Sequence, residues 1–190
     1  MRDKKEVIRK AAIKIFAEQG FHKATTDRIA EEAGVAVGTI YNYFQNKVDV
    51  LEYIFQVEYE KRKTFFEELM LKEASPMEKI RSILEKHFAE VREEPALIKI
   101  ILEERQHTCV DAQGRAGLRK FIEEIIKQGV KEGHLRNVDA EILAVMLFGS
   151  IEAIMREYLI ERGHQPEEEG QVFDRALEEI MKLFRKGLFR

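Results

Sequence analysis

Apolar residues recur at helical spacing along the whole chain. No segment shows sustained alternation of apolar and polar residues, which is the pattern of a half-buried strand. Glycine and proline punctuate the periodic stretches. The predicted helices cover about residues 8–19, 27–33, 37–44 and 47–71, begin again at Pro76 and at Pro95, include residues 118–126, cover residues 140–161, and begin once more at Pro166. The sequence therefore predicts an all-α fold of about nine helices.

The first helices form a short trio before one long helix. The second and third are joined by Gly34-Val35-Ala36-Val37, a short turn that contains glycine, which is helix-turn-helix spacing. Ile40 and Phe44 lie four residues apart and are expected to anchor the third helix to the core. We therefore predict a helix-turn-helix DNA-binding domain over residues 1–47 and a helical bundle for ligand binding and dimerisation over residues 48–190.

The charge of the chain is unevenly distributed. The net charge is −3, yet residues 1–47 carry nine Lys and Arg against six Asp and Glu, while the remainder is acidic. A basic head on an acidic body suits a protein that contacts phosphate at one end only. An architectural protein that binds DNA without sequence preference would be basic overall, so this alternative is less favoured.

Other function classes find little support in the sequence. There is no Gly-rich phosphate loop, Gly-x-Ser-x-Gly or His-Glu-x-x-His motif, so we expect neither an enzyme nor catalytic residues. His107 and Cys109 have no third ligand at a metal-binding spacing, so we expect no metal. Cys109 is the only cysteine, and no apolar run approaches the ~18 residues of a membrane span. We expect a cytoplasmic protein without membrane contact.

Two segments resemble a known family. They are Thr25-Thr26-Asp27-Arg28-Ile29-Ala30-Glu31-Glu32-Ala33-Gly34-Val35 and Gly38-Thr39-Ile40-Tyr41-Asn42-Tyr43-Phe44-Gln45-Asn46-Lys47. With their surroundings, about residues 5–55, they resemble the DNA-binding domain of TetR-family repressors. The resemblance implies a repressor that binds double-stranded DNA at a palindromic operator. The DNA-binding residues it implies are Thr25, Thr26, Arg28, Val37, Gly38, Thr39, Tyr41, Asn42, Tyr43 and Lys47.

Some of these residues are expected at phosphates. Thr25 and Thr26 begin a helix, where hydroxyl and backbone N–H groups can hold an anion. The resemblance also places Lys47 at a phosphate, and Tyr41 and Tyr43 at phosphates or base edges. The alternative for both tyrosines is packing in the small three-helix core.

The others are expected at base edges. The resemblance places Val37, Gly38, Thr39 and Asn42 at base-reading positions. Asparagine can pair with adenine, and valine can contact the methyl group of thymine. Arg28 could reach a base or only a phosphate.

The C-terminal region carries a weaker signal. The stretch Leu102-Glu103-Glu104-Arg105-Gln106 and the pattern through Gly133 resemble acyl-CoA-responsive regulators of the FadR kind within this family. An apolar tunnel suits an acyl chain, and arginines suit the phosphates of coenzyme A. The resemblance thus implies no cofactor but a long-chain acyl-CoA effector. The candidate ligand-binding residues are Phe65, Phe66, Leu69, His87, Phe88, Leu97, Ile101, Leu102, Arg105, Gln106, Arg115, Arg119 and Met146.

Alternatives remain for this ligand set. A drug-like or other small apolar effector is the main rival to acyl-CoA. The arginines could instead pair with nearby glutamates on solvated helix faces, and His87 could be a core histidine in an apolar stripe.

The last two helices are the candidates for a homodimer interface. Gly149 and Ala153 would let another helix approach closely, and a two-fold dimer matches a palindromic operator. The alternative is that both helices are buried within their own chain. We expect effector binding to tilt the helix over residues 47–71 and so change the separation of two recognition helices. The predicted interface residues are Gly149, Ala153, Phe173, Leu177, Ile180 and Phe184.

Overall fold

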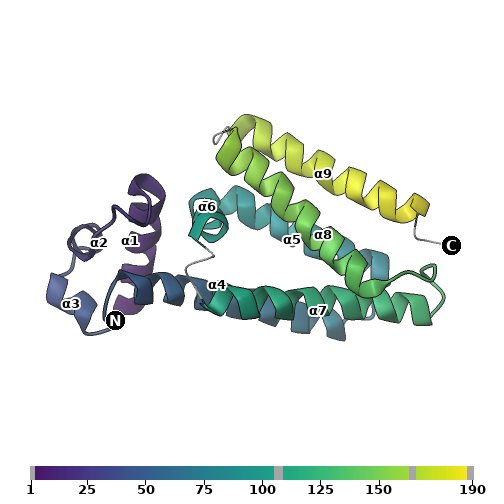
Figure 1. Ribbon diagram of the computed structural model, residues 1–190, viewed down its shortest axis with the longest axis horizontal. Coiled ribbons are helices and arrows are strands. Elements are labelled where there is room, and N and C mark those ends of the chain that lie inside the picture. The colour runs from purple at the N-terminus through teal and green to yellow at the C-terminus, as the bar shows by residue number, and fades with distance from the viewer. Residues whose placement is uncertain (1–2, 105–108, 163–165, 188–190) are drawn as a thin grey trace. The chain divides into compact units, whose positions relative to one another are not determined.

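The computed structural model describes residues 3–104, 109–162 and 166–187 (Figure 1). Over these residues the chain is helical and contains no β-strand, so the predicted all-α fold is confirmed. The helices are α1 (Lys4–Gln19), α2 (Thr26–Ala33), α3 (Val37–Tyr41), α4 (Lys47–Leu71), α5 (Pro76–Glu93), α6 (Pro95–Glu104), α7 (Cys109–Lys131), α8 (Ala140–Arg156) and α9 (Pro166–Gly187).

Two helix ends differ from the prediction. The third ends at Tyr41 instead of Phe44, and beyond it the backbone N–H of Tyr43 donates to the carbonyl of Ile40, only three residues back, at 2.9 Å. The helix predicted over residues 140–161 is α-helical only to Arg156. It continues as a π-helix, η2 (Glu157–Glu161).

The chain forms two compact units. The N-terminal unit comprises Met1–Lys61 and Ala96–Gln113, and the body unit comprises Arg62–Pro95 and Gly114–Arg190. The packing boundary between the two units therefore lies within α4, after Lys61. Val50, Leu51 and Ile54 of α4 are fully buried and belong to the same apolar core as side chains of α1.

The N-terminal unit has one apolar core to which α1, α2, α3, α4 and α6 contribute. Its glycines and caps agree with the sequence pattern: Gly20 ends α1 and Gly34 ends α2, both with positive φ. The core contains Ile8, Ala11, Ala12, Ile15, Phe16, Phe21, Ala24, Ile29, Ala30, Ile40, Phe44, Val50, Leu51, Ile54, Phe55, Leu97 and Ile100.

A charged network joins α1 to α4 beside this core. Arg9 and Glu58 are each 5% exposed, and Arg9 Nη1 donates to Glu58 Oε1 at 3.4 Å. Arg9 Nε donates to both carboxylate oxygens of Glu6, at 3.1 and 3.0 Å. Glu58 also accepts from Lys61 Nζ at 2.8 Å, and Tyr53 Oη donates to Glu6 at 3.3 Å. Desolvation, and then the negative charge of Glu6, raises the pKa of Tyr53.

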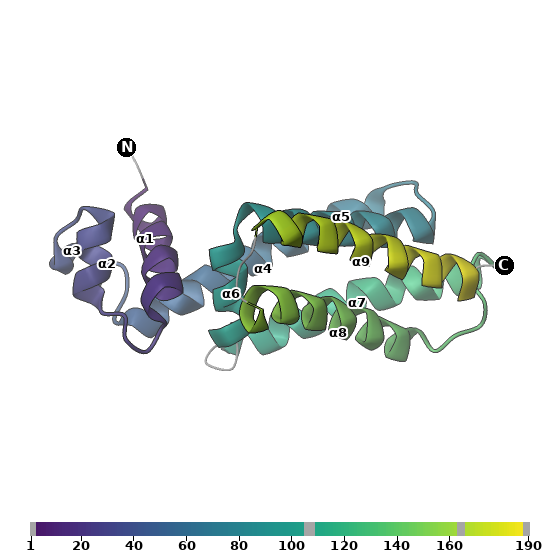
Figure 2. The ribbon, with the colours of Figure 1, turned by 90° about the horizontal axis from the view of Figure 1, so that it is seen from above.

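The body unit packs mainly through aromatic and aliphatic side chains. Phe88 of α5 stacks on Phe173 of α9 with ring centroids 5.3 Å apart. Helix α9 lies along α5 (Figure 2). The end of α7 approaches the start of α5 so closely that a Cβ on Gly129 would lie 2.9 Å from Pro76 Cγ. This unit is therefore tightly packed at the α5–α7 end.

Candidate nucleic-acid interface and effector site

The helix-turn-helix is built as the spacing predicted. Gly34 adopts a left-handed conformation, φ +64°, and the N–H of Val35 donates to the carbonyl of Ala30 at 3.0 Å. Ile29 and Ala30 of α2 and Ile40 of α3 are 0% exposed. These contacts hold α3 against α2 through one side, which leaves the other side of α3 accessible.

The predicted reading residues lie on α3 and directly after it, and they differ in exposure. Tyr41 is 55% exposed and Tyr43 is 44% exposed, so neither belongs to the core of the N-terminal unit. Gly38 and Asn42 are also exposed. Val37 and Thr39 are half-buried, and Val37 packs on the edge of the core.

The start of α2 lies next to this surface. Thr25 is the N-cap of α2, and its hydroxyl accepts from the backbone N–H of Arg28 at 3.3 Å. Thr26 Oγ1 and Tyr41 Oη are 3.2 Å apart, a hydrogen bond that joins α2 to α3. The guanidinium of Arg28 is exposed and pairs with Glu31 at 2.6 Å. Lys47, in contrast, directs its ammonium at the backbone of residues 21–24.

The predicted ligand residues do not gather in one place. Leu97 is buried in the core of the N-terminal unit, and Ile101 packs against that core. Leu102 belongs to the same unit and is buried. Arg105 and Gln106 lie outside the described residues. The candidates placed in the body unit are Phe65, Phe66, Leu69, His87, Phe88, Arg115, Arg119 and Met146.

Within the body unit, the aromatic candidates are packed together. Phe66 contacts Phe65 and Phe121, with ring centroids at 5.8 and 5.4 Å. Leu69 and Phe88 are buried. Met146 is 63% exposed on α8, so the prediction that it lines an internal pocket is not supported. The aromatic cluster around Phe66 is thus the remaining apolar part of the candidate site.

His87 is half-buried on α5. Desolvation of its ring, and then repulsion by the charge of Arg62, lowers its pKa to about 3. The imidazole is therefore neutral at physiological pH. Arg62 itself pairs with Glu90 at 3.3 Å.

Of the two described candidate arginines, Arg115 has a clear partner. Its guanidinium pairs with Glu152 of α8 at 2.8 Å and lies 5.5 Å from the ring centroid of Phe148. Arg119, one turn further along α7, is half-buried. An anionic ligand at Arg115 would have to compete with Glu152.

The predicted dimer residues fall into two groups. Phe173, Ile180 and Phe184 are buried inside the body unit, at 0%, 8% and 6% exposure, so they offer little surface to a second chain. Leu177 is half-buried, whereas Gly149 and Ala153 are exposed. Phe173, Ile180 and Phe184 were predicted at the interface because of their apolar helical spacing. The packing of α9 on α5 within one chain explains that spacing without a second chain.

An exposed apolar stripe on α8 was missed. Ile142, Val145 and Met146 are 55%, 44% and 63% exposed and precede Gly149 and Ala153 at helical spacing. Helix α8 is apolar on nearly all sides, so periodicity could not show which side faces out. Leu183 of α9 is also exposed, at 71%.

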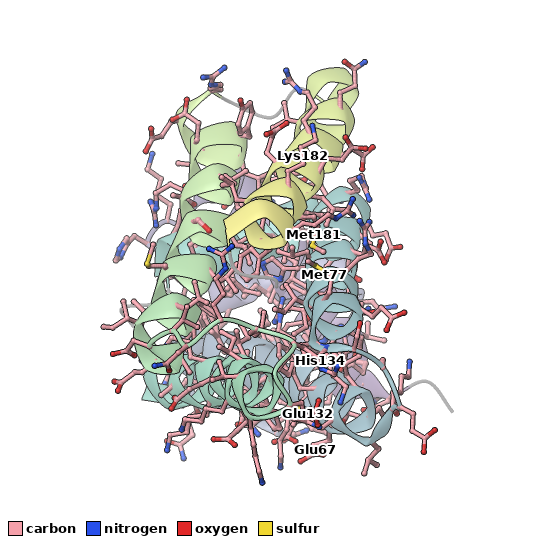
Figure 3. The ribbon with its side chains drawn as sticks, turned by 90° about the vertical axis from the view of Figure 1, so that its right-hand side faces the viewer. Glu67, Met77, Glu132, His134, Met181 and Lys182 are labelled. Carbon is pink, nitrogen blue, oxygen red and sulfur yellow. The ribbon has the colours of Figure 1, made fainter. Side chains whose placement is uncertain are left out.

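Figure 3 shows the end of the body unit. Met77 of α5 and Met181 of α9 lie where these two helices meet, and Glu132 and His134 belong to the turn after α7. His134 Nδ1 and Glu132 are 3.3 Å apart. No group of three His, Cys, Asp or Glu side chains that could hold a metal ion occurs in the described part of the chain. None of its helices is both long and apolar enough to cross a membrane.

Comparison with known proteins identifies the family. Residues 8–54 match the bacterial regulatory proteins of the tetR family, and residues 73–169 match the tetracyclin repressor-like C-terminal domain. The chain is 28% identical over 159 residues to the fatty acid metabolism regulator protein of Bacillus subtilis (strain 168). This alignment covers 79% of this chain and 80% of that protein.

Solved structures agree on the fold. The fatty acid degradation regulator FadR from Bacillus halodurans superposes with a TM-score of 0.84 and 23% identity, covering 98% of this chain and 97% of that chain. FadR from Bacillus subtilis in complex with stearoyl-CoA has a TM-score of 0.76 and 24% identity, covering 94% and 96%. The prediction of a DNA-binding regulator, as opposed to an enzyme, is confirmed. Because both halves of the chain match, the second over about half of its 190 residues, this protein belongs to the TetR family of bacterial transcriptional regulators.

Proposed function

We propose that this regulator is a repressor that leaves its operator when long-chain acyl-CoA binds to the body unit. The observation that carries the proposal is the likeness, over nearly the whole chain, to a FadR that binds stearoyl-CoA. The sequence relative is likewise a fatty acid metabolism regulator. The aromatic cluster of buried Phe66 and half-buried Phe65 and Phe121 supplies apolar surface of the kind that an acyl chain needs.

The test is a titration of operator-bound protein with palmitoyl-CoA, followed by fluorescence anisotropy. Release of the DNA at micromolar palmitoyl-CoA, with little release by palmitate or coenzyme A alone, would support the proposal. An intact complex would reject acyl-CoA and favour a drug-like apolar effector, without affecting DNA binding.

Arg115 and Arg119 are proposed to meet the phosphates of coenzyme A. Since Arg115 pairs with Glu152, ligand phosphate would replace this carboxylate. Arg115→Ala should weaken the palmitoyl-CoA response about tenfold or more, because one or more charge-assisted hydrogen bonds are lost. Glu152→Gln, which frees the guanidinium from a charged competitor, should strengthen it. Equal responses in both variants and the wild type would exclude Arg115 from the site.

For DNA, we propose that α3 enters the major groove with Tyr43 and Asn42 facing it. Tyr43→Ala should weaken binding to all DNA sequences about equally, whereas Asn42→Ala should change the sequence preference. The proposal is supported by the exposure of both residues directly after α3, which is anchored by buried Ile40. Unchanged operator affinity in Tyr43→Ala would exclude this orientation of α3.

We further propose a homodimer that acts on a palindromic operator in the cytoplasm. The exposed stripe of Ile142, Val145 and Met146 continues to Gly149, where a second helix could approach closely. An apolar surface of this kind on a soluble chain favours association with a second copy. Because α4 belongs to both units, it is the proposed route by which an effector in the body unit changes DNA affinity.

A further inference from the structure

The ammonium group of Lys47 is occupied by the backbone of its own chain. Lys47 is the first residue of α4, and its Nζ donates to three carbonyl oxygens of one short segment. The acceptors are Phe21, His22 and Ala24, at 2.8, 2.9 and 3.0 Å. The same Nζ lies 4.7 Å from the ring centroid of Phe21. An ammonium has three N–H donors, so these carbonyls use all of them.

The segment that Lys47 holds leads directly into the candidate DNA interface. Residues 21–24 lie between α1 and α2, and the N–H of Ala24 donates to the carbonyl of Gly20 at 3.2 Å. Thr25, the N-cap of α2, follows at once, and Thr26 bonds to Tyr41 of α3. The position of the α2 N-terminus therefore depends on a segment with little regular structure of its own.

We propose that Lys47 is a positioning residue that holds residues 21–24, and through them the start of α2, in the geometry that DNA requires. Its contribution to operator binding passes through Thr25 and Thr26. A direct hydrogen bond from Lys47 to phosphate would require it to release at least one carbonyl. This revises the role that the family resemblance implies for Lys47.

Charge and shape can be separated by two substitutions. Lys47→Met removes the ammonium, while Lys47→Arg keeps the positive charge but replaces a compact group with a planar fork that cannot address three converging carbonyls. A phosphate contact would survive in Lys47→Arg, because arginine binds phosphate at least as well. The positioning role would be lost in both variants.

The experiment measures operator affinity of the full-length protein from 50 to 300 mM salt, together with amide hydrogen exchange of residues 21–26. Lys10→Met, which removes an exposed lysine from α1, is the matched control for the loss of charge. We expect both Lys47 variants to bind the operator about tenfold more weakly, with faster exchange in residues 21–26. For Lys47→Arg the slope of log affinity against log salt should stay unchanged.

Two outcomes would overturn the proposal. One is wild-type operator affinity in Lys47→Arg together with a slope lowered by about one unit in Lys47→Met, which indicates a phosphate contact. The other is faster exchange with unchanged operator affinity, which indicates a purely structural role. Circular dichroism confirms that each variant is folded, and Lys47→Arg keeps the test decisive if Lys47→Met does not fold.

Discussion

The two units expose hydrophobic side chains of different chemistry. In the N-terminal unit, the large exposed ones are Tyr41 and Tyr43, which carry hydroxyl groups, and Val48. In the body unit they are aliphatic or thioether side chains: Leu71, Ile142, Val145, Met146 and Leu183. A hydroxyl can bond to phosphates and bases, whereas an aliphatic stripe gains only from burial against another apolar surface. This contrast supports the proposed DNA contact of the N-terminal unit and the proposed dimer contact of the body unit.

The units also differ in how they treat buried charge. The N-terminal unit buries the pair of Arg9 and Glu58 between α1 and α4. The body unit buries Lys79, whose Nζ donates to the carbonyl of Met70 at 3.3 Å, and holds His87 in its neutral form. Ion pairs constrain geometry more than apolar contacts do, so the DNA-binding unit should be the more rigid of the two.

The largest effect should come from a charge on the α8 stripe. Val145→Glu should dissociate the proposed dimer by more than about a hundredfold, because an unpaired buried charge costs about 3–5 kcal/mol. Binding to a palindromic operator should fall with it. Leu71→Glu, at an 87% exposed position outside α8, is the matched control for adding a charge. Sedimentation velocity measures the oligomeric state. A Val145→Glu variant that stays dimeric would show that the α8 stripe is not the dimer interface.

The next effect concerns the buried ion pair. Arg9→Met should lower the free energy of unfolding by about 1–3 kcal/mol, because the buried carboxylate of Glu58 loses this guanidinium while it keeps Lys61. Combining it with Glu58→Leu should recover most of the loss. Lys14→Met, which breaks the exposed pair of Lys14 and Glu32, should change much less. Urea denaturation measures all four proteins, and equal losses at Arg9 and Lys14 would contradict the contrast in burial.

His87 sharpens the comparison through pH. The pKa of His87 is about 3 in the folded chain, below the ordinary 6.5. Between these two pH values the unfolded chain binds a proton at His87 and the folded chain does not. Stability from neutral His87 is therefore complete above about pH 6.5 and falls as the pH drops towards 3. Between pH 7 and 5 this amounts to about 2 kcal/mol. His87→Gln should show that much less acid destabilisation in urea melts, with His22→Asn as the control at an exposed position. Identical pH profiles for His87→Gln and wild type would be inconsistent with a desolvated ring.

The smallest effect is expected from substitutions at two helix N-caps, Thr25 of α2 and Ser75 of α5. Thr25→Ala and Ser75→Ala should each cost about 1 kcal/mol of stability, because each hydroxyl accepts from a backbone N–H at the start of its helix. Only Thr25→Ala should also weaken operator binding, since Ser75 caps α5 in the body unit. Thermal melts and DNA anisotropy separate the two quantities. Loss of operator affinity in Ser75→Ala as well would show that cap stability alone explains both.

Local signals predicted much of this molecule. The Ser75 capping box, with Glu78 returning its carboxylate to the cap N–H at 2.7 Å, appears where the sequence placed it. The anchoring of α3 by Ile40 and Phe44 follows from their spacing, and the structure buries both. These features depend on residues within a few positions of one another, so a one-dimensional pattern contains them.

The effector and dimer residues depended on distant parts of the chain. Leu97 and Phe88 are both apolar helix residues, yet one packs with α1 and α4 and the other stacks on α9. Periodicity says that a side chain is buried, but not against which helix. The carbonyls that accept hydrogen bonds from Lys47 lie about 25 residues away in sequence. They belong to a connection without a helical pattern.

The amino-acid sequence by itself thus determined the helices, the helix-turn-helix and the family, because these are encoded in spacing, caps and a contiguous motif. Only the tertiary structure decided which side of α8 is exposed, which unit holds each candidate ligand residue, and what Lys47 binds. The physical reason is that hydrophobic burial is non-directional. It selects apolar residues without specifying their partners, and those partners are set by how the helices pack.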